Sequence, residues 1–267
     1  MNSAWSVLPI TIYVPAGSVN AYKTDANWKI YSSVIQPMLE YGEIDLGLRT
    51  SEGKRIIFSD RNVGATGPLA IGKYFAWGET TGATVNVAAG QTQGPLTGQS
   101  FAKNTYEHSN STYTTMNKYN ATDNYTVLEA GDDAATVHMG SKWRTVSAEE
   151  LNMLLDEDKF TMEILDTNGQ VLTDISPDAQ KVGIRFISKI PGFEGKSVVF
   201  PACGAGVDSN AKDVHLTVSL WTNSLVSTNV QKAHFLYFYI TGSNNISILV
   251  STTDRYYGRQ VRGVKIV

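Results

Sequence analysis

The stretch WTNSLVSTNVQKAHFLYFYITGSNNISILVSTTDRYYGRQVRGVKIV, residues 221–267, decides the fold that this sequence predicts. It contains two runs of strand-forming residues, Ala233–Ile240 and Ile246–Ser251. Between them lies Thr241–Asn245 (TGSNN), in which Gly, Ser and Asn favour a hairpin turn. A third run, Arg259–Val267, follows. We therefore expect an antiparallel sheet in this part of the chain.

The side chains of the hairpin predict a recognition face. Alternate residues of a strand point the same way, so Phe235, Tyr237 and Tyr239 share one face, and Leu236, Phe238 and Ile240 supply the core. By the same rule Ser247 and Leu249 point outward, and Ile246, Ile248 and Val250 inward. Tyr gives contact area at low entropic cost, and Ser and Asn give hydrogen bonds. The predicted binding residues are Phe235, Tyr237, Tyr239, Ser247, Leu249, Thr252, Asp254, Tyr256 and Tyr257. The alternative is an ordinary sheet, since Tyr and Thr are good strand formers.

Composition excludes several classes of protein. Hydrophobic residues make up 42% and charged residues 18% of the 267 residues, which is typical of a globular chain. The net charge is -3 and no basic cluster could follow a phosphate backbone, so nucleic acid is not an expected partner. No apolar run reaches the roughly 20 residues that span a bilayer, although a lipid anchor outside this sequence is compatible with it. Cys203, the single cysteine, lies in FPACG and is expected to be a small buried hydrophobe.

The chain is expected to have two parts. Residues 1–40 predict a strand, Ile10–Pro15, and a helix that begins after Ser18 and stops before Pro37. In residues 41–267, the Gly-, Thr-, Asn- and Gln-rich residues 82–126 predict a long loop outside the regular core. Ser147 and Glu150 form a capping-box pattern at the start of a helix. We expect an α+β fold with one or two helices and a loop-rich antiparallel sheet.

Several short strings occur in an order that resembles a known family. They are DLGL (Asp45–Leu48), NVGAT (Asn62–Thr66), GKYFAWGET (Gly72–Thr80), KYN (Lys118–Asn120), DDAA (Asp132–Ala135), GSKWR (Gly140–Arg144), FPACG (Phe200–Gly204), LWTNS (Leu220–Ser224) and RYYGRQVRGV (Arg255–Val264). Residues 42–267 resemble the Fibrobacter succinogenes major paralogous domain family of Bacteroidetes. The resemblance implies a C-type lectin-like fold, in the branch with formylglycine-generating enzymes and the variable proteins of diversity-generating retroelements. Residues 1–40 resemble the closing unit of a BspA-type leucine-rich repeat.

The sequence departs from the enzymes and calcium lectins of that branch. Formylglycine-generating enzymes need a reactive cysteine pair, and this chain has only Cys203, so the oxidase activity is not carried over. The calcium-binding triplets of C-type lectins are absent, and WTN at residues 221–223 lacks the aspartate ligand. Asp132 and Asp133 are better explained as charge at a helix N-terminus. We therefore expect no catalytic residue, no metal and no cofactor. Trp77, Trp143 and Trp221 are expected to be buried, and Arg144 and Arg262 to order loops.

The comparison with variable proteins points to a binding function. Diversified AAC or AAT codons cannot become Lys, Glu, Gln, Met or Trp, and these five residues are absent from Ala233–Gly258. We expect a non-enzymatic, receptor- or adhesin-type protein, diversified by a retroelement. Its partner would be a protein or glycan on another cell or host, and its place the cell surface or exterior, alternatively a phage virion. The alternatives are a degenerate relative of formylglycine-generating enzymes and a structural module of a surface or fimbrial assembly.

Overall fold

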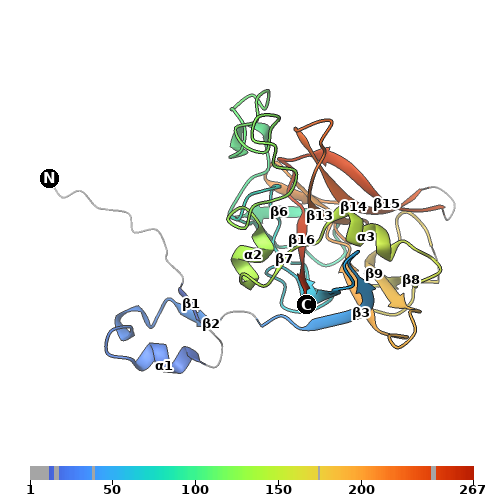
Figure 1. Ribbon diagram of the computed structural model, residues 1–267, viewed down its shortest axis with the longest axis horizontal. Coiled ribbons are helices and arrows are strands. Elements are labelled where there is room, and N and C mark those ends of the chain that lie inside the picture. The colour runs from blue at the N-terminus through green and yellow to red at the C-terminus, as the bar shows by residue number, and fades with distance from the viewer. Residues whose placement is uncertain (1–11, 15–17, 38–39, 174, 242–244) are drawn as a thin grey trace. The chain divides into compact units, whose positions relative to one another are not determined.

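The computed structural model describes residues 12–14, 18–37, 40–173, 175–241 and 245–267, and these fall into two units (Figure 1). The units are Met1–Tyr41 and Gly42–Val267. In the first, strand β1 (Ile12–Val14) pairs in parallel with β2 (Ile35–Pro37). Helix α1 (Val19–Thr24) and the 3-10 helix η2 (Lys29–Tyr31) lie between them in the chain. The helix expected to run up to Pro37 is wrong in extent: α1 ends at Thr24 and Ile35–Pro37 is a strand. Ser18 makes no side-chain capping hydrogen bond.

A seven-stranded sheet dominates the second unit. Its strands are β3 (Glu43–Arg49), β4 (Arg55–Asn62), β7 (Arg144–Thr145), β13 (Val218–Leu225), β14 (Lys232–Thr241), β15 (Asn245–Asp254) and β16 (Gln260–Ile266). The order is β15-β14-β13-β16-β4-β3, and β7 pairs with β16. The β13–β16 pair is parallel and the other recorded pairs are antiparallel. The predicted C-terminal hairpin is confirmed as β14–β15, and residues 242–244 of its predicted turn lie outside the described residues.

Two smaller sheets complete the unit. β8 (Phe160–Asp166), β9 (Lys181–Ser188) and β10 (Ser197–Pro201) form one in the order β10-β9-β8. The second contains β5 (Thr84–Val85), β6 (Gly94–Thr97), β11 (Ala205–Val207) and β12 (Asn210–Lys212). The helices of this unit are η3 (Lys103–Thr105), α2 (Ala134–Met139) and α3 (Ala148–Leu154). α3 contacts β13, β14 and β15 and lies beside the last two in Figure 1.

The prediction of an α+β, C-type lectin-like fold is wrong. Strands account for 40% of the chain and helices for 11%, so the protein is mostly β. Among the described residues, the longest α-helix has seven residues. Helices this short are not stable by themselves and depend on packing against strands. The helical pattern after Ser147 is local, whereas alternating strand patterns and turns recur through the rest of the second unit.

One face of the hairpin belongs to the main hydrophobic core. Leu236, Phe238 and Ile240 are buried there with Leu151 and Leu154 of α3, as the alternation predicted. The predicted capping box anchors α3. The Ser147 Oγ accepts a hydrogen bond from the Glu150 backbone nitrogen at 3.1 Å, and the Glu150 carboxylate accepts one from the Ser147 backbone nitrogen at 2.8 Å. Arg144 donates to both carboxylate oxygens of Glu150 at 2.9 and 2.5 Å, so it orders this turn as expected.

A second cluster contains two of the three predicted buried tryptophans. Trp77 donates from Nε1 to the Thr222 carbonyl, and Trp221 donates from Nε1 to the Phe75 carbonyl, each at 2.8 Å. The segment around Trp77 is thus joined to β13 by two reciprocal hydrogen bonds. Both rings are 1% exposed and Trp143 is 9% exposed, which confirms the prediction for all three.

Residues 82–126 were expected to lie outside the regular core, and this is wrong in part. The segment includes β5, β6 and η3 among many turns. Phe101, Tyr106, Tyr113 and Tyr119 are buried. The prediction rested on the polar composition of the segment and gave no weight to these aromatic residues. Their buried rings hold its irregular backbone against the rest of the unit.

Replacing Trp221 with Ala tests the packing of the second cluster. The change removes a fully buried ring and one of the two hydrogen bonds that the Phe75 carbonyl accepts, the other coming from the Arg259 backbone nitrogen. We therefore expect a loss of about 3–5 kcal/mol in the free energy of unfolding. Denaturant unfolding followed by the remaining tryptophan fluorescence measures it. Trp28→Ala is the control, since Trp28 is 41% exposed and belongs to the other unit. Equal losses in both variants would contradict the assignment.

Candidate functional site

The aromatic side of the β14–β15 hairpin is buried at one end and partly exposed toward the other. In the register, Phe235 is opposite Ser251, Tyr237 opposite Leu249, and Tyr239 opposite Ser247. Directly opposite residues of an antiparallel pair point to the same side of the sheet. The residues Tyr237, Tyr239, Ser247, Leu249, Ser251 and Thr253 therefore share one side, which we call the hairpin face.

Burial decreases along the hairpin face. Ala233 and Phe235, on the same side as Tyr237, are buried in the second cluster at 0% and 5% exposure. Tyr237 and Tyr239 are partly buried, and their rings stack with centroids 4.7 Å apart. Leu249 is 39% exposed. The uncovered part of this side thus begins at Tyr237.

The structure places four of the predicted site residues elsewhere. Phe235 is buried against Trp221, with ring centroids 6.1 Å apart, so it forms the covered end of the face and not part of its exposed surface. Thr252 is opposite His234 and Asp254 is opposite Lys232, which puts both on the other side of the hairpin. Leu249 and Thr252 are three positions apart, so strict alternation along the strand already puts them on opposite sides. Ile246, predicted to point inward, is 40% exposed because the hairpin extends beyond the core there.

Tyr256, the fourth, and Tyr257 lie between β15 and β16. Tyr256 is 9% exposed, and its ring meets the edge of Tyr113 at 5.0 Å. Burial is the largest cause that raises its pKa. Tyr257 is partly buried, with its ring centroid 4.3 Å from that of Tyr256. Tyr256 is therefore a packing residue, and Tyr257 remains partly accessible.

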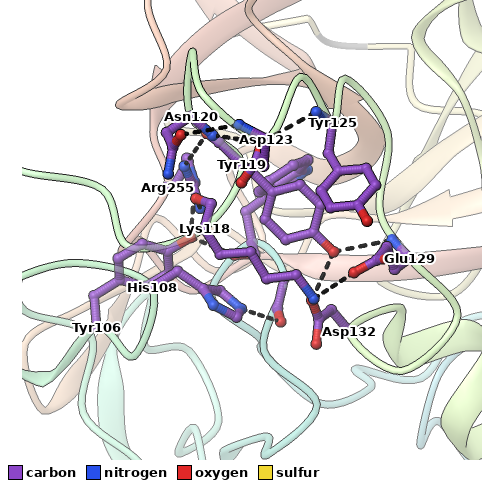
Figure 2. A network of polar contacts seen from close by, with 12 residues as sticks. Tyr106, His108, Lys118, Tyr119, Asn120, Asp123, Tyr125, Glu129, Asp132 and Arg255 are labelled. Carbon is purple, nitrogen blue, oxygen red and sulfur yellow. Dashed lines mark hydrogen bonds and ion pairs between the residues drawn. The ribbon is translucent and has the colours of Figure 1, made fainter.

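Arg255, between these strands, is held in a cage of aromatic rings and carbonyl oxygens (Figure 2). Its carbon Cζ lies 4.9 Å from the ring centre of Trp77, 5.2 Å from that of Tyr106 and 5.6 Å from that of Tyr119. Its nitrogens donate to the Tyr106 hydroxyl at 2.7 Å and to the carbonyls of Val230, Lys118 and Tyr119 at 2.8, 3.1 and 3.2 Å. The side chain thus joins the aromatic-rich loop to the base of the hairpin.

An outer layer of polar contacts stabilises the same loop (Figure 2). Lys118 Nζ lies 2.6 Å from both Glu129 and Asp132, and the Tyr119 hydroxyl donates to Asp132 at 2.6 Å. Hydrogen bonds from Lys118 and Tyr119 outweigh burial and lower the pKa of Asp132. Asp133 caps α2 by accepting from the backbone nitrogens of Ala135 and Thr136, which confirms its predicted place at a helix N-terminus. These contacts account for Asp132 and Asp133 without a metal.

Arg262 and Arg259 are the other buried arginines of this C-terminal segment. Arg262 donates to Asn62 Oδ1 at 2.8 Å and to the carbonyls of Ser59 and Val199 at 2.8 and 2.6 Å, which confirms the ordering role expected for it. Arg259 donates from Nη1 to the Ser219 hydroxyl, and its Nε has no acceptor among the described residues. The sequence prediction missed Arg259 and Ser219. The three arginines of RYYGRQVRGV, in an otherwise aromatic and apolar string, were the available signal.

Three groups of types that often act in catalysis, Cys203, His108 and His138, are buried or bonded to backbone carbonyls. Burial raises the pKa of the Cys203 thiol to about 12, so this cysteine is not a thiolate at neutral pH. His108 and His138 hydrogen-bond through Nε2 with the carbonyls of Gly78 and Thr80 at 2.7 and 2.8 Å. In the described part of the chain, no group of three or more His, Cys, Asp or Glu residues could hold a metal ion.

A cavity of about 730 Å³ lies elsewhere in the second unit, near Trp143. Lys142, Arg144 and Lys265 contribute positive charge to its lining. Arg144 is paired with the buried Glu150, and Lys265 with Glu43, so only Lys142 brings a charge without a recorded ion pair. The cavity therefore offers less for recognition than the hairpin face does.

No protein family, curated protein or solved structure matches the chain. The resemblance to the Fibrobacter succinogenes paralogous domains therefore stays a prediction from the short strings alone. No helix formed by the described residues is both long and apolar enough to cross a membrane.

Replacing Arg255 with Met tests the cage. Several buried oxygens would lose their donor, so we expect the free energy of unfolding to fall by about 3 kcal/mol or more. Thermolysin cleavage between Tyr106 and Asn120 should become faster, as mass spectrometry of the fragments would show. Arg55→Met is the control, since the Arg55 side chain is 54% exposed and such surface pairs contribute at most about 1 kcal/mol. Unchanged cleavage in Arg255→Met would contradict the role of the cage.

Glu79 predicts a pH dependence of stability. Burial is the largest cause that raises its pKa from 4.5 to about 7, although hydrogen bonds from Glu107 and Gln99 oppose the shift. The folded chain holds this proton more tightly than the unfolded chain, so the contribution to stability is complete below about pH 4.5 and is lost as the pH rises through about 7. Between pH 4 and 8 the wild type should lose on the order of 3 kcal/mol in its free energy of unfolding through Glu79, and Glu79→Gln should not show this loss. Urea unfolding of both proteins across this range checks it, and parallel pH profiles would contradict it.

Proposed function

We propose that this protein is a non-enzymatic binding protein of the receptor or adhesin type, which recognises its ligand with the hairpin face. The stacked and partly exposed rings of Tyr237 and Tyr239 are the observation that carries the proposal. Tyrosine is frequent among the residues that dominate binding energy, and its ring needs little ordering on contact. The hydroxyls of Ser247, Ser251 and Thr253, on the same side of the sheet, supply hydrogen bonds around the rings.

The scaffold beneath the hairpin face favours recognition over catalysis. Phe235 and Trp221 pack on the same side of the sheet at the buried end of the face, and the α3 core packs on the opposite side, so the two strands are held from both sides. A rigid platform lowers the entropy that binding must remove. The buried, protonated state of Cys203 supports a binding protein rather than a relative of the cysteine-dependent oxidases. The proposed partner is a glycan or protein on another cell or host, and the proposed location is the cell surface or exterior.

The change of Tyr237 and Tyr239 together to Ala tests the proposal. Both side chains are partly exposed, so the variant should keep its unfolding midpoint within a few degrees. Binding to a glycan array and to host-cell surfaces should fall by at least about thirtyfold, since a tyrosine hot spot contributes about 2 kcal/mol or more. Tyr31→Ala is the matched control, because Tyr31 is 45% exposed and belongs to the other unit. Undiminished binding by the folded double variant would exclude this face.

A separate observation tests the retroelement hypothesis. The gene neighbourhood should contain a near-copy of the 3′ end beside a reverse transcriptase gene. Sequences from different isolates should then differ at the codons of the hairpin face more than at those of Leu236, Phe238 and Ile240.

A further inference from the structure

The three buried arginines of residues 255–262 differ in how their charge is satisfied. Each is at most 7% exposed. Arg255 and Arg262 donate to carbonyl, hydroxyl or amide oxygens from each of their three side-chain nitrogens. Arg259 donates only to the Ser219 hydroxyl, and only from Nη1. In the described residues, no carboxylate forms an ion pair with it.

The surroundings of the Arg259 guanidinium are otherwise aromatic. Its Cζ lies 3.7 Å from the ring centre of Phe235 and 5.2 Å from that of Trp221. Burial lowers the pKa of Arg259 to about 9, and the nearby phenols of Tyr237 and Tyr257 only partly oppose this. A buried charge whose donors are only partly satisfied is costly. Arg259 therefore has donor capacity for a further acceptor, which the described residues do not supply.

Arg259 lies at the buried base of the hairpin face. Its hydrogen-bond acceptor, Ser219, is opposite Tyr237 in the register of β13 and β14. Phe235, which it contacts, is two residues before Tyr237 on the same side. Tyr257, partly buried, interacts with the guanidinium from the connection between β15 and β16. The charge is thus next to the tyrosines to which we assign ligand binding.

The geometry points to Arg259 as the binding residue for a carboxylate, carried by an acidic sugar such as a uronic acid. This rests on the proposed function of the hairpin face. Nη1 is engaged by Ser219 and Nε is buried, so Nη2 is the nitrogen left to donate a charge-assisted hydrogen bond to a carboxylate.

The remaining groups of the face suit a sugar better than an acidic peptide. A pyranose ring has a flat apolar side that packs on an aromatic ring, as Tyr237 and Tyr239 would allow, and hydroxyls that pair with Ser and Thr. A stable interface with a protein typically buries about 800 Å² per partner. Here the tyrosines are partly buried, and Leu249 is the most exposed apolar residue of the face.

The test is a calorimetric titration of the full chain with glucuronate, with glucose as the neutral probe and triglutamate as the acidic peptide. Glucuronate should bind at least roughly tenfold more tightly than glucose, because hydrogen bonds to charged groups are the stronger ones. Arg259→Gln should lose this difference while its melting temperature stays at or above that of the wild type. Lys142→Gln, at an exposed cation outside the face, should keep it.

Each contrary outcome is distinct. Equal affinity of the wild type for glucuronate and glucose, or no saturable binding of glucuronate at millimolar concentration, overturns the carboxylate site even if Arg259→Gln fails to fold. Tighter binding of triglutamate overturns the sugar assignment. If Tyr237→Ala/Tyr239→Ala abolishes binding to the array but Arg259→Gln does not, the hairpin face stands and Arg259 has no part in it.

Discussion

The insertion of Arg255 between Trp77, Tyr106 and Tyr119 is the interaction on which the irregular half of this protein depends. One planar cation fills two needs there. Its faces stack on aromatic rings, and its edges satisfy carbonyls of a loop that has little regular hydrogen bonding of its own. Lysine could not do both, since its ammonium group is not planar. The same residue directly follows β15, so the loop and the β14–β15 hairpin are held by one side chain.

Much of the regular structure could be predicted because it follows local rules. Alternation identified the hairpin and the core side of β14, and the Ser147–Glu150 capping box marked the helix start. The buried tryptophans were predictable from their apolar, glycine-flanked strings. The fold class was not predictable in this way, because the number and pairing of short strands depend on contacts between distant residues. The share of the chain in helices was therefore overestimated.

The candidate site was predicted in outline and not in detail. Alternation placed Tyr237, Tyr239, Ser247 and Leu249 together, but it could not show that Phe235 is covered by Trp221 or that Tyr256 packs on Tyr113. Those are tertiary contacts. Thr252 and Asp254 were misplaced although the register is regular, because aromatic and polar character was given more weight than strict alternation. Arg259 was missed because its unusual feature, a missing partner, has no counterpart in a one-dimensional pattern.

The position of β15 at the end of its sheet has a consequence for how this protein can change. Within the described chain, β14 is the single strand paired with β15. A new side chain at Ser247, Leu249 or Ser251 therefore meets one neighbouring strand and solvent, whereas a change at Phe238 meets closely packed core on all sides. Substitutions on the proposed ligand face and substitutions that unfold the protein thus fall on different faces of the same hairpin. A population of such proteins could explore many ligands while each member kept the same stability.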